Sequence, residues 1–150
     1  MPYTINTYNR DELTVVADGT LDESTDIKLS FTASGLVNDG APVFVVTTAD
    51  DTVREADATT IGTGRVVGVA ETAISDGVTG YITIQGFATI PGAAIDGGSF
   101  TRGAPVFLSE NTGKLTSTRP SGSGVTVYQV GLATTTTKMI IAPKVATILS

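Results

Sequence analysis

A five-residue string occurs twice in this chain of 150 residues, and it limits the possible folds more than any other feature. Residues 40–44 read GAPVF, and the same letters return at residues 103–107, which is 63 positions later. The strings VGVA at 67–70 and VGLA at 130–133 keep the same spacing. Shared order and shared spacing indicate two copies of one structural unit, and a repeated unit favours a scaffold or binding module over an enzyme.

The composition indicates that this unit is made of β-strands. Thr, Val and Ile together supply 53 of the 150 residues, and their β-branched side chains suit a pleated surface. The 17 glycines fit a chain with many tight turns. About ten to twelve short strands separated by Gly, Pro, Asn and Asp are typical of a barrel or a sandwich. We therefore predict an all-β fold.

The repeat also divides the chain. Residues 1–34 are predicted to form an extended N-terminal arm and an entry strand, because residues 27–31 alternate between apolar and polar side chains. Residues 35–150 are predicted to form a β-barrel-like domain with repeat units at about 35–97 and 98–150. Each unit looks too short to bury a core alone, so we expect the two to close together into one barrel- or sandwich-like single domain.

Particular strands and glycines can be assigned within the units. Residues 81–85 alternate strictly, and residues 125–130 have a strand-like composition. The glycine that opens each GAPVF string is expected to adopt a positive φ at a tight turn, and the proline after it is expected to begin a strand. Gly68 and Gly131 lie inside predicted strands, which indicates a bulge or a close approach of two backbones.

The residues that carry most enzyme chemistry are missing or scattered. The chain has no Cys and no His, so disulfides are excluded and the commonest general base is absent. Asp50, Asp51, Glu55 and Asp57 could supply oxygen ligands to a hard cation, but an acidic hairpin tip is the favoured interpretation. The sequence alone does not exclude a pair of carboxylates arranged for glycoside hydrolysis, since any two acidic residues can meet in space. We predict no enzyme, no catalytic residue, no metal ligand and no cofactor.

The charge is unevenly distributed. The net charge is −6, made of −9 over residues 1–76 and +3 over residues 77–150. This asymmetry fits either a solvated acidic surface or the pairing of the acidic end of one subunit with another subunit. No basic stripe that would indicate nucleic-acid binding is visible, and no apolar run approaches the ~20 residues that cross a bilayer. The first residues have no signal-peptide pattern.

The N-terminal arm is the best candidate for a partner contact. Its candidate contact residues combine apolar anchors with one cation: Pro2, Tyr3, Ile5, Tyr8 and Arg10. An arm of this kind can add a strand to the open edge of a partner's sheet, where main-chain hydrogen bonds supply affinity. The alternatives are a first strand folded back on its own domain, or a frayed terminus.

The sequence also resembles a known group of proteins. GAPVF, a Thr-rich hairpin, VGVA and then GYITIQGF at residues 80–87 resemble capsid decoration (cement) and head-fibre proteins of tailed bacteriophages. The likeness covers about residues 35–142. Residues 13–20, LTVVADGT, separately look like openings seen in phage virion proteins.

The resemblance implies a structural role on a virion. It implies a trimeric subunit, made in the host cytoplasm, that clamps the outer capsid surface with help from its arm and stabilises the head by bridging capsid subunits. The partners would be the major capsid protein and other copies of the chain, with no nucleic acid and no membrane. The alternatives are a tail-tube, baseplate or fibre component, or a receptor- or carbohydrate-binding module that uses exposed Tyr81, Phe87 or Tyr128.

Overall fold

Strands form the framework of the molecule. The structure is a computed structural model that describes residues 26–59 and 65–144, and within these ranges it contains no α-helix. A short 3-10 turn, η2 (Gly92–Ala94), interrupts the strands. The strands are β1 (Ile27–Ala33), β2 (Pro42–Val45), β3 (Thr52–Glu55), β4 (Gly68–Ala70), β5 (Thr79–Thr89), β6 (Pro105–Leu108), β7 (Leu115–Thr116), β8 (Gln129–Ala133) and β9 (Lys138–Lys144). The all-β prediction is confirmed.

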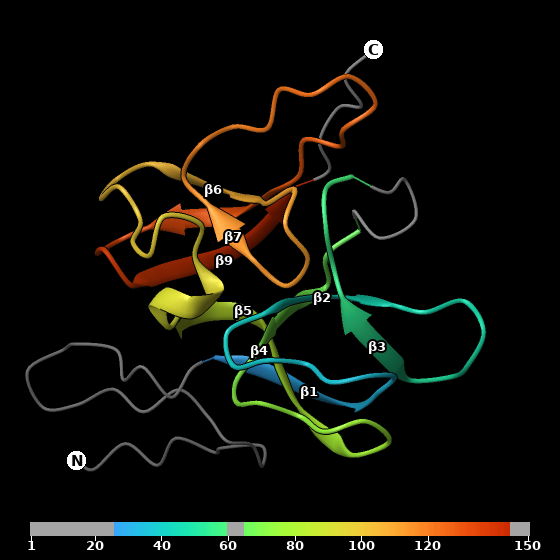
Figure 1. Cartoon of the computed structure of the whole chain (residues 1–150). Helices are drawn as coiled ribbons and strands as arrows, with labels where there is room; N and C mark the ends of the chain where they lie inside the picture. Colours follow the sequence, from blue (N-terminus) through green and yellow to red (C-terminus); the bar gives the residue numbers. More distant parts are fainter. Residues whose placement is uncertain (1–25, 60–64, 145–150) are drawn as a thin grey trace, which may run out of the picture.

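The first five strands close on themselves in the lower part of Figure 1. They follow the order β1-β3-β2-β4-β5, and β5 pairs back onto β1 in antiparallel fashion. We call this closed unit the first barrel. It encloses a core in which Val37, Val43, Val53 and Ile82 are fully buried. The predicted entry strand is thus the strand that closes the barrel, and the first repeat unit encloses its core only together with this strand.

Strand β5 belongs to both halves of the molecule. Its first residues pair with β1 and β4, and its last residues pair with β9. From there a second sheet continues in the order β5-β9-β8-β6-β7 in the upper part of Figure 1. A parallel bridge between Ile95 and Leu115 links the chain after η2 to β7, as β1 links to β3 in the first barrel. The second half of β5 therefore takes the position that β1 has in the first barrel.

The repeat seen in the sequence is a repeat of backbone pairing. Both GAPVF prolines begin strands, as predicted. The cross-strand pairs of the first barrel return in the second sheet after 63 residues: Pro42 with Val69 and Val43 with Gly68, then Pro105 with Leu132 and Val106 with Gly131. The two halves are thus copies in register as well as in sequence.

The glycines have the roles expected of them. Gly40 and Gly103 have φ of 72° and 75°, which is the left-handed region that favours glycine. A Cβ at Gly68 or Gly131 would lie under 3.0 Å from a backbone carbonyl oxygen of the next strand. Close backbone approach, one of the two roles expected for Gly68 and Gly131, therefore explains why these strands contain glycine.

The two halves are joined by backbone hydrogen bonds as well as by β5. After β3 the chain runs beside the second sheet, where Ala58 N donates to Ser109 O at 2.8 Å and Gly113 N donates to Ala56 O at 2.9 Å. Thr126 N donates to Ala58 O at 2.8 Å. This contact explains why β8 begins at Gln129 and not at the predicted residue 125: Thr126 bonds to the other half instead of to the strand ladder.

One apolar core also crosses the junction. It combines Val66 and Val69 from the first half with Leu108, Leu115 and other residues of the second half, all buried. The two halves therefore pack as a single domain, as predicted.

Candidate functional site

The predicted contact residues of the arm lie outside the part of the chain that the structure describes. Pro2, Tyr3, Ile5, Tyr8 and Arg10 all precede Asp26, the first described residue. Their role stays a prediction. The structure does show where the arm joins the fold, and that position is next to a hollow in the surface.

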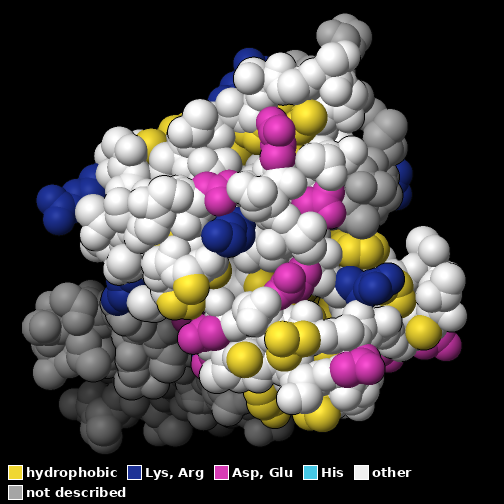
Figure 2. Space-filling model, viewed as in Figure 1, with side chains coloured by type: hydrophobic (Ala, Val, Ile, Leu, Met, Phe, Trp, Pro, Cys, Tyr) yellow, Lys and Arg dark blue, Asp and Glu magenta, His cyan; other side chains and the backbone are white. Residues whose placement is uncertain are grey.

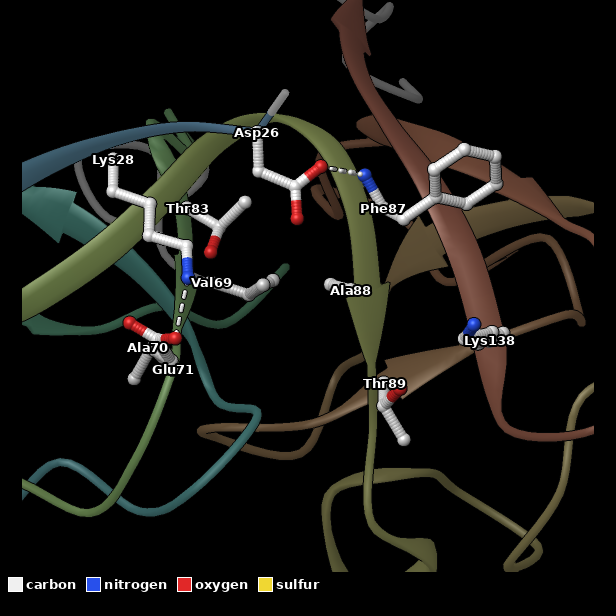
Figure 3. A pocket seen from close by; sticks show the side chains of 10 residues that line it. All are labelled: Asp26, Lys28, Val69, Ala70, Glu71, Thr83, Phe87, Ala88, Thr89 and Lys138. Carbon is white, nitrogen blue, oxygen red and sulfur yellow. Dashed lines mark hydrogen bonds and ion pairs between the residues drawn. The ribbon is translucent and has the colours of Figure 1, made fainter. Parts of the chain in front are cut away.

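The hollow lies where β5 passes from the first barrel to the second sheet, and its volume is about 220 Å³. Figure 3 shows the side chains that line it, which come from β1, β4, β5 and β9 and from the residues next to β1 and β4. The lining residues are Asp26, Lys28, Val69, Ala70, Glu71, Thr83, Phe87, Ala88, Thr89 and Lys138.

An ion pair and a hydrogen bond connect the strands on the polar side of this hollow. Lys28 Nζ forms an ion pair with Glu71 Oε1, and Asp26 Oδ1 accepts a hydrogen bond of 2.7 Å from Phe87 N. Asp26 also lies against Gly86, which has a φ of 107°, a backbone conformation that favours glycine. The ion pair is partly exposed and contributes about 0–1 kcal/mol. The arrangement fastens the start of β1 to β5, so it positions the root of the arm.

The candidate metal ligands are not brought together. Glu55 Oε1 accepts hydrogen bonds from Asn38 N at 2.7 Å and from Asn38 Nδ2 at 2.8 Å. Asp57 Oδ1 accepts from Thr59 N at 3.0 Å, while Asp50 and Asp51 lie exposed at the tip between β2 and β3. Among residues 26–59 and 65–144, no group of three acidic side chains is placed to hold a metal ion.

Tyr128 is buried, so the expectation that it is an exposed glycan contact is wrong. It is 9% exposed, and its hydroxyl donates a hydrogen bond of 3.0 Å to Val66 O across the junction. Burial raises the pKa of the Tyr128 phenol above its usual value. Tyr81 and Phe87 are exposed, as that hypothesis requires, on the first and second halves of β5 respectively.

An exposed apolar row crosses the outer face of the second sheet, and the sequence analysis missed it. Direct cross-strand pairs join Phe87 on β5 to Ile140 on β9, Ile140 to Leu132 on β8, and Leu132 to Pro105 on β6. All four are exposed, with 39% for Phe87, 36% for Ile140 and 42% for Leu132. We call these four residues the apolar row. Apolar residues at outward positions of alternating strands were the signal that could have revealed it.

Comparison with known families identifies the protein family of this chain. A family model described as phage cement protein matches residues 24–140. The chain belongs to the phage cement protein family. The match runs from just before β1 into β9, so it includes both halves of the repeat. A comparison with curated proteins gave no match.

Family membership confirms the resemblance inferred from the repeated motifs. A cement protein is a structural, capsid-stabilising component of a phage virion, and its place is on the capsid.

The surface of the cement protein is mixed in character. In the view of Figure 2, acidic side chains are spread from the upper to the lower part, with separate basic side chains and small apolar areas between them. The described part of the cement protein contains no helix with the length and apolar character to cross a membrane.

Proposed function

We propose that this cement protein binds the outer surface of a phage head and stabilises it by bridging neighbouring subunits of the major capsid protein. The observation that carries the proposal is the family match over 117 consecutive residues, which includes every strand of the first barrel and most of the second sheet. A rigid two-part domain suits this role, because a bridge between subunits resists separation only if its own halves stay together.

The proposal assigns the capsid contact to the part of the arm that precedes β1, within residues 1–34, and the rigid body to β1 together with the barrel-like domain of residues 35–150. The arm supplies apolar anchors at Tyr3, Ile5 and Tyr8 and a cation at Arg10. Its root is fixed by the hydrogen bond from Phe87 N to Asp26. A segment anchored at one end loses less freedom on binding than a free peptide, and it can add a strand to a neighbouring sheet edge.

The proposal includes a homotrimer. Each copy would contribute a modest contact with the shell, and three linked copies would engage several capsid subunits at once. Linked binding of this kind can exceed the affinity of a single contact by about 10²–10⁴-fold.

The experiment that tests this function uses capsids assembled without the cement protein. The full chain and a variant lacking residues 1–12 are mixed with such capsids, and co-sedimentation measures the bound fraction. We expect the full chain to bind and the truncated chain to remain in the supernatant while keeping the circular dichroism of a folded β-protein. Undiminished binding of the truncated chain would remove the arm from the proposal.

Bridging is tested on the same particles by heating them. Capsids saturated with the cement protein should release their subunits at a higher temperature than bare capsids, since a ligand that binds only the assembled state stabilises that state. An unchanged release temperature at full occupancy would show that the protein decorates the shell without bridging its subunits.

A further inference from the structure

Three of the four residues of the apolar row have buried counterparts in the first barrel, while Phe87 corresponds to Lys28, which is exposed. The residues that correspond to Pro105, Leu132 and Ile140 in the repeat are Pro42, Val69 and Thr83, which pair across β2, β4 and β5. All three are buried, Val69 at 1% and Thr83 at 3%, and Val69 belongs to the core that crosses the junction. Val69 packs against the second half at the junction and Thr83 lies beside it in the lining of the hollow, whereas the equivalent residues on the second half are exposed.

The opposite side of the junction shows the same asymmetry. The hairpin tip between β6 and β7 contacts the first half, where Gly113 N donates to Ala56 O at 2.9 Å and Thr112 Oγ1 donates to Asp57 Oδ2 at 3.3 Å. The corresponding tip between β2 and β3 contains Asp50 and Asp51, and it is exposed.

The two tips are equivalent in conformation as well as in position. The pairing of Val45 with Val53 corresponds to that of Leu108 with Leu115, which places Asp51 where the other tip has Gly113. Asp51 has φ of 47° and Gly113 has φ of 72°, so both are left-handed. Val45, next to the first tip, is 40% exposed, while its counterpart Leu108 is fully buried at the junction.

We propose that a second copy of this chain docks the hairpin tip of its first barrel onto the second half of the first copy. The contact would repeat, between two molecules, the junction that each molecule makes within itself. It would cover the apolar row and Val45 together. The two surfaces differ from each other, so the contact is head-to-tail and leaves one of each surface free on a pair of copies.

The charges at the equivalent positions of the two halves favour a second copy of the chain as the partner. The same correspondence that aligns Gly113 with Asp51 aligns Thr112 with Asp50, and it aligns Asp57 with Arg119. The Thr112–Asp57 contact within the chain would therefore become an Asp50–Arg119 contact between chains. Asp50 and Arg119 are both exposed and have opposite charges. The acidic first part of the sequence and the positive second part complement each other in the same direction.

This inference deepens the proposed self-association by naming its two surfaces, and it does not depend on capsid binding. Because it is tested without capsids, its failure and the failure of the proposed function can be told apart. A head-to-tail contact forms a closed ring if its rotation closes and a filament if it does not.

The absence of cysteine makes a cross-linking test direct. Asp50→Cys and Arg119→Cys are prepared in two separately tagged chains, mixed at high concentration and oxidised. We expect a disulfide that joins the two different tags, in excess of the dimers that either variant forms alone. The matched control is a single chain carrying both Thr112→Cys and Asp57→Cys, which should close an internal disulfide at the equivalent junction. Failure of the mixed pair where this control closes overturns the proposal, as does a product made only of like chains.

A second variant tests the apolar row. Adding Leu132→Asp to the Arg119→Cys chain should lower the yield of the mixed disulfide by about tenfold or more, because a carboxylate would be buried without a partner. Tyr81→Asp is the control, since Tyr81 is 59% exposed and lies on the first barrel outside the row. Both chains should keep the circular dichroism of the parent. Equal yields from the two chains would remove the apolar row from the contact.

Discussion

Single residues decide how closely the strands of this protein approach each other. Gly131 faces the carbonyl of Ile140 and Gly68 faces the carbonyl of Thr83, each too near for a Cβ. The same requirement at equivalent positions explains why glycine was kept in both copies of the repeat. It also means that the smallest possible side chain is already too large there.

Gly131→Ala should therefore destabilise the fold by about 1–3 kcal/mol, since overpacking forces the neighbouring strand to move. Gly124→Asn is the control, because no atom lies near a Cβ at Gly124 and asparagine tolerates its φ of 79° better than other residues do. Denaturant unfolding followed by circular dichroism measures both variants. Equal loss of stability in the two would mean that close approach is not the reason for the glycine.

Tyr128 carries a hydrogen bond between the two halves, from its hydroxyl to Val66 O. Tyr128→Phe should cost about 1–3 kcal/mol, because a buried carbonyl loses its donor. Tyr81→Phe, at an exposed position, should change stability by less than about 0.5 kcal/mol. The difference between these two variants in denaturant unfolding reports the value of the buried bond.

The pH dependence of the Tyr128 contribution follows from the direction of its pKa shift. Burial raises the pKa in the folded protein above 10.0, the ordinary value that the unfolded chain keeps. The stability linked to this group is thus complete below that pH and is lost as the pH rises through the folded pKa. Unfolding measured at increasing alkaline pH should show a smaller decline for Tyr128→Phe than for the parent protein. Parallel declines would contradict the assignment.

Among the elements, β5 has the largest influence because it belongs to both halves. The strand closes the first barrel against β1 and then begins the second sheet beside β9. Loss of β5 would open the first barrel and would also remove the edge of the second sheet. Folding of the two halves is therefore expected to be coupled, and the apolar core that crosses the junction adds to this coupling.

Calorimetry tests this coupling. Ile82→Ala removes packing from the first core and Met139→Ala removes packing from the second, each at a cost of about 2–5 kcal/mol. Both variants should lower the temperature of one common transition, with calorimetric and van't Hoff enthalpies equal. Two separate transitions in either variant would show that the halves unfold independently.

The elements also show how far the sequence could predict the fold. The repeat, the all-β class and the strand at residues 81–85 were predictable from spacing and alternation. The sharing of β5 between the two halves was not, because its pairings with β1 and β9 join distant parts of the chain. The apolar row was missed for a related reason: its members meet only through strand pairings that join distant parts of the chain. The burial of Tyr128 likewise depends on the junction and not on its own strand.

At the scale of the whole molecule, the uneven charge and the two free surfaces point to assembly with a direction. If the head-to-tail contact closes after three copies, no free surface remains. Light scattering on a sizing column should then give a mass near three times 15.3 kDa that does not change with concentration. Growth of the mass with concentration would indicate an open filament, and a constant mass of one chain would contradict the trimer in solution.

The sharing of β5 has a mechanical consequence for a protein of a capsid-stabilising family. Tension that pulls the first barrel away from the second sheet runs along one continuous backbone, which a covalent strand transmits without breaking hydrogen bonds one at a time. The antiparallel partners β1 and β9 pair with opposite ends of that strand. Tension along the strand therefore loads their hydrogen bonds together in shear. Two barrels joined by a flexible linker would instead stretch before resisting. The continuous strand therefore makes the molecule resist extension between its two halves.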